Sequence, residues 1–160
     1  MRPSGIPFQD MCTMVGLMTI TWAWAENCLA MTLGVINEQV GAVPGHSEAP
    51  LSLKRRIRYF RDALNSVASL HLLKEEGRAL AECFVKLAPR RNNFVHGAAW
   101  QTHEGAFESL AIGVAAGKYA AESHRFNVAD AHALNVEIAK LSDDMTAFML
   151  KVCEALGAAT

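Results

Sequence analysis

The segment with the clearest capacity for chemistry is Arg90-Arg91-Asn92-Asn93-Phe94-Val95-His96. A histidine, whose imidazole titrates near neutral pH, can remove the proton from a ribose 2′-hydroxyl. An arginine can hold phosphate oxygens through parallel hydrogen bonds and stabilise the charge that develops as phosphorus is attacked. Arg91 and His96 together therefore predict cleavage of RNA without a metal ion, with the 2′-hydroxyl as the nucleophile.

Spacing decides whether these side chains can act together. Asn92 and His96 are four residues apart and share one face of a helical turn. Arg91 and His96 are about 140° apart around an ideal helix, so they meet only if the arginine reaches around or the turn deviates. Arg91 also continues an apolar stripe beyond Leu87, where a charge needs a partner or a polar cleft. The alternatives are a salt bridge from Arg91 to an acid such as Glu26, and carbonyl capping by His96.

Glycine and proline divide the chain into four amphipathic segments and one insert. The sequence predicts an all-α fold, an antiparallel four-helix bundle that forms a single domain over residues 1–160. A small β-hairpin or loop is expected as an insert before the last helix. The expected helices run from about Phe8 to Val40, from Leu53 to about Val67, from about Leu70 to Leu87 and from Asn127 to about Leu156, with the insert over residues 98–127.

The candidate segment lies between the third helix and the insert. Pro89 removes a backbone donor and usually kinks or restarts a helix. A short new helical turn is expected from Pro89 to His96, with Gly97 as its C-cap. At the far end of the insert, Asn127 is a favourable N-cap for the last helix, and Asp130 lies in its first turn.

The first helix is apolar on two opposite faces and needs cover on both. One face can pack on the core, and a second subunit can cover the other, because an exposed stripe of this size would aggregate. A homodimer with Trp24 and Met31 near a symmetric interface is therefore predicted. The alternative is that the domain wraps this helix completely. The first face reads Val15, Met18, Trp22, Leu29, Leu33, Ile36 and Val40, and the second reads Leu17, Trp24, Cys28, Met31 and Val35.

A run of cations flanks the apolar stripe of the second helix. Five cations within eight residues, from position 54 to position 61, could bind RNA phosphates. The alternative is a solvated helix face beside a core stripe. The candidate RNA-binding residues are Arg55, Arg58, Arg61 and Arg90.

Composition excludes several other classes. The chain has 160 residues, 51% of them hydrophobic, and a net charge of −1, so it can build a core but does not attract nucleic acid as a whole. Its four widely spaced cysteines suit buried free thiols in a reducing cytoplasm. No spacing of a metal site is present, and neither a metal nor a cofactor is expected. The apolar stretch from Met11 to Trp24 is too short to span a membrane, so we expect a cytoplasmic protein.

Arg91-Asn92-x-x-x-His96 resembles the Arg-x(4–6)-His motif of the HEPN superfamily, in which a polar residue often follows the arginine. The flanking pattern is also similar, with a helix before the motif, Trp100 after it and an amphipathic helix at the end. The resemblance implies a dimer of helical bundles that acts as a metal-independent endoribonuclease in toxin–antitoxin, phage-defence or RNA-processing systems. It implies that Arg91 and His96 are the catalytic pair and that Asn92 orients the histidine or contacts phosphate.

The resemblance leaves other functions open. Some HEPN proteins lack activity and bind nucleotides, RNA or protein partners, so a non-catalytic dimeric binding module is the main alternative. A third hypothesis places the function in an apolar pocket between helices. An antitoxin protein is an implied partner of the toxin form. In a subgroup of toxins, an antitoxin modifies a tyrosine two residues after the histidine; Ala98 stands there in this chain, which argues against that form of regulation.

Overall fold

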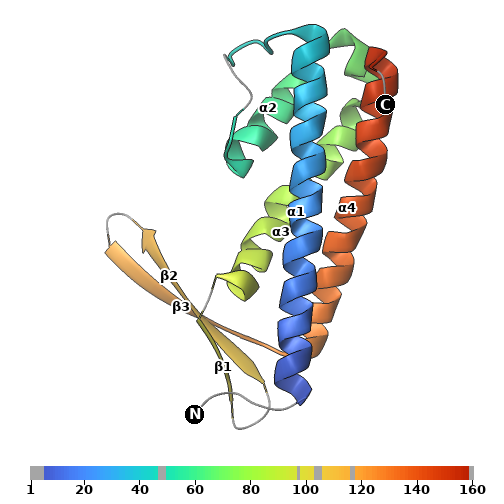
Figure 1. Cartoon of the computed structure of the whole chain (residues 1–160). Helices are drawn as coiled ribbons and strands as arrows, with labels where there is room; N and C mark the ends of the chain where they lie inside the picture. Colours follow the sequence, from blue (N-terminus) through green and yellow to red (C-terminus); the bar gives the residue numbers. More distant parts are fainter. Residues whose placement is uncertain (1–5, 47–49, 97, 103–105, 116–117, 159–160) are drawn as a thin grey trace. The chain divides into compact units, whose positions relative to one another are not determined.

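The computed structural model describes residues 6–46, 50–96, 98–102, 106–115 and 118–158. Over these ranges the chain is mainly helical and carries one small sheet (Figure 1). The expected all-α class with a β insert before the last helix is confirmed. The elements are α1 (Ile6–Val40), α2 (Leu53–Ser66), the 3-10 helix η1 (Ala68–Leu73), α3 (Lys74–Val95), β1 (Ala98–Gln101), β2 (Phe107–Ala115), β3 (Lys118–Phe126) and α4 (Val128–Leu156).

The chain divides into two compact units. Unit 1 comprises Met1–Thr21 and Lys86–Ile138, and unit 2 comprises Trp22–Val85 and Ala139–Thr160. Both units therefore take segments from α1, α3 and α4. The sheet belongs wholly to unit 1, and α2 belongs wholly to unit 2.

Unit 2 is a helical bundle with a core of large aromatic side chains. Trp22 of α1 and Phe84 of α3 meet edge to face, with ring centroids 5.5 Å apart. Phe60 of α2 and Phe148 of α4 meet in the same way, also at 5.5 Å. All four rings are buried, so each of the four α-helices contributes to the interior of this unit.

Polar contacts show how the helices of unit 2 run. Arg61 of α2 pairs with Glu82 of α3, and Asn65, one turn further along α2, accepts a hydrogen bond from Arg78. Helices α2 and α3 are therefore antiparallel. Helix α3 also runs opposite to α4, whereas α1 and α4 run in the same direction within this unit (Figure 1). The expected antiparallel packing is therefore found between α3 and its neighbours α2 and α4, but not between α1 and α4.

In unit 1, the insert forms a three-stranded antiparallel sheet in the order β1-β2-β3. The expected hairpin corresponds to β2 and β3, which pair Phe107 with Phe126, and β1 adds an edge strand. The stacked rings of Phe107 and Phe126 are 6.3 Å apart and form a buried cluster with Met11 of α1 and Ala131 of α4. This cluster anchors the sheet to the helical segments of its own unit.

Helix α3 continues through Pro89 to Val95, so the expected restart at Pro89 is wrong. Proline cannot donate to the carbonyl of Val85, four residues earlier. Both residues are exposed, so water can satisfy that carbonyl without breaking the helix. The chain before Lys74 forms η1 and not the expected first turn of this helix. Gly97, the expected C-cap, lies outside the described residues.

The start of α4 matches the sequence signal. The Asp130 backbone N–H donates to Asn127 Oδ1 at 2.9 Å, and the Asn127 N–H donates to Asp130 Oδ2 at 2.8 Å. This reciprocal capping satisfies two backbone donors that the helix itself leaves unpaired. It also fixes the point at which β3 gives way to α4.

The two apolar faces of α1 differ in burial. The first face is largely buried, with Trp22 only 3% exposed. On the second face Trp24 and Met31 are each 56% exposed and Leu17 is 49% exposed. The hypothesis that the chain wraps this helix completely is therefore wrong, because the described residues leave much of the second face uncovered.

Two further predictions from the sequence concern the burial of the cysteines and a possible membrane span. Cys28 and Cys153 are buried free thiols, but Cys12 and Cys83 are exposed, so the expectation of buried thiols is wrong for those two. Spacing along the chain did not reveal which helix face each thiol occupies. Among the described helices, none is long and apolar enough to cross a membrane.

Gly77 allows α3 to approach its neighbours closely. A Cβ at this position would lie 2.6 Å from Leu64 Cδ1 and 3.0 Å from Phe148 Cζ, and both of those residues are buried. By contrast, a Cβ at Gly34 of α1 would meet nothing within 4 Å. The two glycines should therefore respond in opposite ways to the same substitution.

We expect Gly77→Ala to lower the free energy of unfolding by about 1 kcal/mol. Overpacking costs about 1–3 kcal/mol, which exceeds the gain of up to about 1 kcal/mol from removing a helical glycine. Gly34→Ala should raise the free energy of unfolding, because only the gain applies there. Urea unfolding followed by circular dichroism measures both changes. Equal stabilisation by the two variants would contradict the close packing of α3.

Candidate functional site

Arg91 and His96 meet at the C-terminal end of α3. Arg91 Nη1 lies 3.0 Å from His96 Nε2 and 3.2 Å from Asn92 Oδ1. A guanidinium can only donate hydrogen bonds, so His96 Nε2 must accept here and carries no proton. The structure therefore brings together the three residues that the sequence identified as catalytic.

The contact forms because His96 lies just beyond the last residue of α3, Val95. The His96 backbone N–H still donates to the carbonyl of Asn92 at 2.9 Å, as in a helix. The side chain, however, is no longer confined to the helical position about 140° away from Arg91. Because the helix ends here, the side chains of Arg91 and His96 can meet, although a continuous helix would turn them to different faces.

Strand β2 holds this end of the helix in place. Ser109 Oγ donates to the carbonyl of Asn93 at 3.0 Å. That carbonyl belongs to the last turn of α3, where carbonyl groups run out of donors within the helix. Ser109 itself is fully buried, and the bond links the sheet to the segment that carries Arg91 and His96.

The three side chains remain accessible to a ligand. Asn92 and His96 are exposed, and Arg91 is half-buried. Both hydrogens of Arg91 Nη1 point to neutral acceptors, Asn92 Oδ1 and His96 Nε2, which an incoming anion could replace. The arrangement can therefore bind a phosphate oxygen at Arg91 and accept a proton at His96.

Arg90 is engaged differently from the role expected for it. Its Nη1 donates to both carboxylate oxygens of Glu137 on α4, each at 2.8 Å. Lys86 Nζ lies 3.8 Å from the same carboxylate. Arg90 thus ties α3 to α4 within unit 1, and its charge is partly compensated before any RNA arrives.

The three candidate arginines of α2 belong to unit 2. Arg61 pairs with Glu82, and Arg58 Nε lies 3.9 Å from Asp62 while its side chain is 81% exposed. Arg55 is exposed. Two of these three arginines therefore have acidic neighbours, which weakens the attraction of the run for phosphate.

Two other residues singled out from the sequence are Glu26 and Trp100. Glu26, considered as a partner for a buried cation, accepts a hydrogen bond from Trp22 Nε1 one turn earlier in α1. Trp100 lies in β1, but its side chain falls outside what the structure describes, so its suggested place beside a cleft is not defined.

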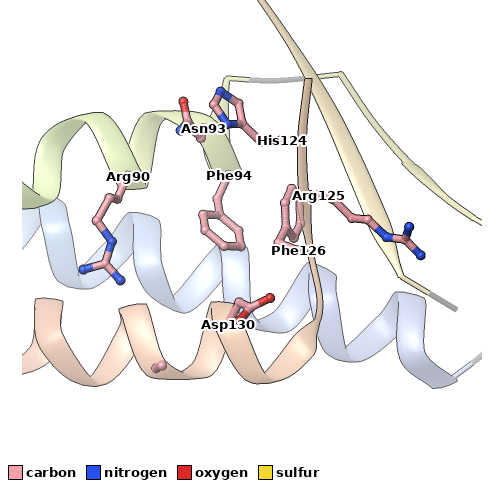
Figure 2. Close-up of a pocket in the computed structure, with 8 residues that line it drawn as sticks. Arg90, Asn93, Phe94, His124, Arg125, Phe126 and Asp130 are labelled. Carbon is pink, nitrogen blue, oxygen red and sulfur yellow. The ribbon is translucent and has the colours of Figure 1, made fainter. Parts of the chain in front are cut away.

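A cavity of about 320 Å³ lies next to the end of α3 and was not predicted from the sequence (Figure 2). Phe94 of α3 and Phe126 of β3 form its aromatic part, with ring centroids 4.3 Å apart. The pattern of the insert did not reveal the register of β3, and so gave no sign that His124 would face α3. The lining residues are Arg90, Asn93, Phe94, His124, Arg125, Phe126, Asp130 and Ala133.

No group of three or more histidine, cysteine, aspartate or glutamate side chains that could hold a metal ion occurs in the described ranges. Comparison with known proteins gave no match to any family model, curated protein or solved structure. The geometry of Arg91, Asn92 and His96 and the neighbouring cavity are therefore the features of the chain that point to a function.

The contact between Arg91 and His96 predicts the tautomer of the histidine. In its neutral form, His96 should carry its proton on Nδ1, because Nε2 accepts from Arg91. Long-range proton–nitrogen correlation spectra of labelled protein distinguish the two tautomers. Arg91→Met should release this preference, and exposed His132 of α4 provides an internal reference. A neutral His96 protonated mainly on Nε2 would show that the contact does not exist.

Proposed function

We propose that this chain is a metal-independent endoribonuclease of the HEPN type that works as a homodimer. The observation that supports it is the 3.0 Å contact between Arg91 Nη1 and His96 Nε2 at an accessible helix end. It joins a proton acceptor to a phosphate-binding cation, the two groups that cleavage through a 2′-hydroxyl needs. The motif Arg91-Asn92-x-x-x-His96 agrees with this chemistry.

In the proposed reaction, an RNA phosphate first takes the hydrogen bond that Arg91 otherwise gives to His96. The exchange frees the lone pair on Nε2, which then accepts the proton of the adjacent 2′-hydroxyl. The 2′-oxygen forms a bond to phosphorus while the bond from phosphorus to the 5′-oxygen breaks. The departing 5′-oxygen takes a proton from water, leaving a 2′,3′-cyclic phosphate on one product and a 5′-hydroxyl on the other.

Asn92 has a positioning role in this proposal. Its Oδ1 accepts from Arg91 Nη1, and its backbone carbonyl accepts from the N–H of His96. The same residue therefore restrains both members of the pair. Arg91 stabilises the negative charge that grows on the phosphate oxygens as the 2′-oxygen attacks.

Purified protein should cut RNA in the presence of a chelator, because the proposed step uses only protein groups, and DNA should survive because it has no 2′-hydroxyl. His96→Ala should lower the rate by about 10²–10⁴, the usual contribution of a general base. His132→Ala is the matched control, since His132 is also exposed and lies on α4. Mass spectrometry of the products should find 2′,3′-cyclic phosphate ends.

The enzyme hypothesis fails if several classes of RNA remain intact or if His96→Ala cuts as fast as the wild type. The non-catalytic binding module would then take its place. The HEPN resemblance extends the proposal to a toxin or phage-defence component in the cytoplasm, with an antitoxin as a protein partner. Expression of the wild type should then slow growth, and expression of His96→Ala should not.

The homodimer is proposed from the second face of α1. In unit 2 the Trp24 indole lies where α1 contacts α4, and its Nε1 donates to Thr146 Oγ1 at 3.3 Å. Met31 lies two turns further along α1, and Leu150, which is 50% exposed, lies one turn beyond Thr146 on α4. A second copy of the chain would cover these apolar side chains across a two-fold axis. The HEPN resemblance implies that the motifs of the two protomers face each other in such a dimer.

Sedimentation velocity should show a dimer at micromolar concentration. Met31→Glu should raise the dissociation constant by about tenfold or more, because it places an unpaired charge in a desolvated apolar contact. Leu72→Glu is the matched control, because Leu72 is 94% exposed and belongs to η1, which contributes none of the side chains of this face. A wild type that stays monomeric would remove the dimer from the proposal.

A further inference from the structure

The cavity beside α3 offers a surface for an aromatic ligand. Phe94 is half-buried, whereas Phe126 is 7% exposed and belongs to the buried cluster of unit 1. Their rings are tilted by 46° at a centroid distance of 4.3 Å, so Phe126 supports Phe94 from one side. Phe94 therefore presents a fixed ring to a cavity of about 320 Å³ (Figure 2).

The same cavity contains polar groups suited to the edge of a planar ligand. His124 Nε2 is shielded from solvent and has no hydrogen-bond partner among the described residues. Glu122 Oε2 lies 3.7 Å from this nitrogen, too far for a hydrogen bond. An unsatisfied buried nitrogen is costly, and a ligand that bonds to it would recover that cost. Asn93, which also lines the cavity, can both donate and accept through its amide.

Arg90 adds a cation at the wall of the cavity. Both of its bonds to Glu137 use Nη1, so within the described part of the chain Nε and Nη2 remain available to a ligand. The ion pair with Glu137 also fixes the direction of the guanidinium. Arg125 lines the cavity as well, but its guanidinium extends away from Phe94 and Phe126 (Figure 2). Arg90 is therefore the cation best placed to receive a phosphate.

We propose that this cavity binds one nucleobase of the RNA strand that is cut at Arg91 and His96. The base stacks on Phe94, as bases do on aromatic side chains in many RNA-binding proteins. Its edge bonds to His124 and Asn93, and the adjoining phosphate meets Arg90. The chemical class of the ligand is thus a nucleotide within a single-stranded RNA.

The position of the strand rests on the proposed function. Arg90, Asn93 and Phe94 share one face of the last turns of α3 because they are three and four residues apart. Arg91 and His96 lie on the adjoining face of the same turns. A helix with its side chains is about 10 Å across, a separation that a few linked nucleotides can span. The cavity would therefore select a base at a fixed place beside the cut.

The test uses a short 2′-O-methyl RNA, which cannot be cut because its 2′-oxygen is blocked. A series of such strands, each lacking the base at one position, is titrated with the full chain, and fluorescence anisotropy gives the dissociation constants. Phe94→Leu keeps an apolar side chain but removes the ring face. His124→Gln is a second variant outside the buried cluster, and His132→Gln, exposed on α4, is its matched control.

We expect loss of the base at one position to weaken binding to the wild type and to His132→Gln by about tenfold. Loss of the same base should have little effect on binding to Phe94→Leu, because that variant has already lost the stacking contact. His124→Gln should reduce the penalty at the same position. Thermal unfolding of each variant verifies that it is folded before the titration is interpreted.

The proposal is overturned if no position is sensitive to loss of its base, or if Phe94→Leu and the wild type suffer equally. It is also overturned if free nucleoside monophosphates bind in a Phe94-dependent way while no RNA position responds, because the ligand is then a free nucleotide. This binding assay does not measure cleavage. Base-dependent binding without cleavage in the separate assay would therefore reject the enzyme and retain the nucleobase site.

Discussion

The candidate site depends on where helix α3 ends. Arg91 and His96 are five residues apart, a spacing that an uninterrupted helix would turn to different faces. The helix ends at Val95, so His96 keeps a backbone bond to Asn92 but can turn its imidazole to the guanidinium. Had α3 stopped at Pro89 or continued past His96, this 3.0 Å contact would not form in the same way.

The other elements of unit 1 act on this helix end. Ser109 of β2 donates a hydrogen bond to the carbonyl of Asn93, and the carboxylate of Glu137 on α4 accepts hydrogen bonds from Arg90. The small sheet therefore has a structural role beyond connecting two helices, because it fixes the last turn of α3 and supplies one wall of the cavity. The last turns of α3 and the residue that follows them thus present a proton acceptor and a cation on one face and an aromatic cavity on the next.

The helices were largely predictable, because apolar residues at three- and four-residue intervals mark the buried face of an amphipathic helix. The start of α4 was predictable from Asn127 and Asp130, which act locally. Contacts between distant residues were not. The bond from Arg90 to Glu137 joins residues 47 positions apart, and the place of His124 depends on strand register. The passage of α3 through Pro89 was missed because it depends on solvent exposure, which one sequence does not show.

The central claim is that Arg91 and His96 act as one unit on RNA. Single-turnover cleavage rates of the wild type, Arg91→Ala, His96→Ala and the double variant measure this directly. Residues that act as a unit are strongly non-additive, so the double variant should be about as slow as the slower single variant. If the two losses instead multiply, the residues contribute independently, and the contact between them is not the basis of catalysis.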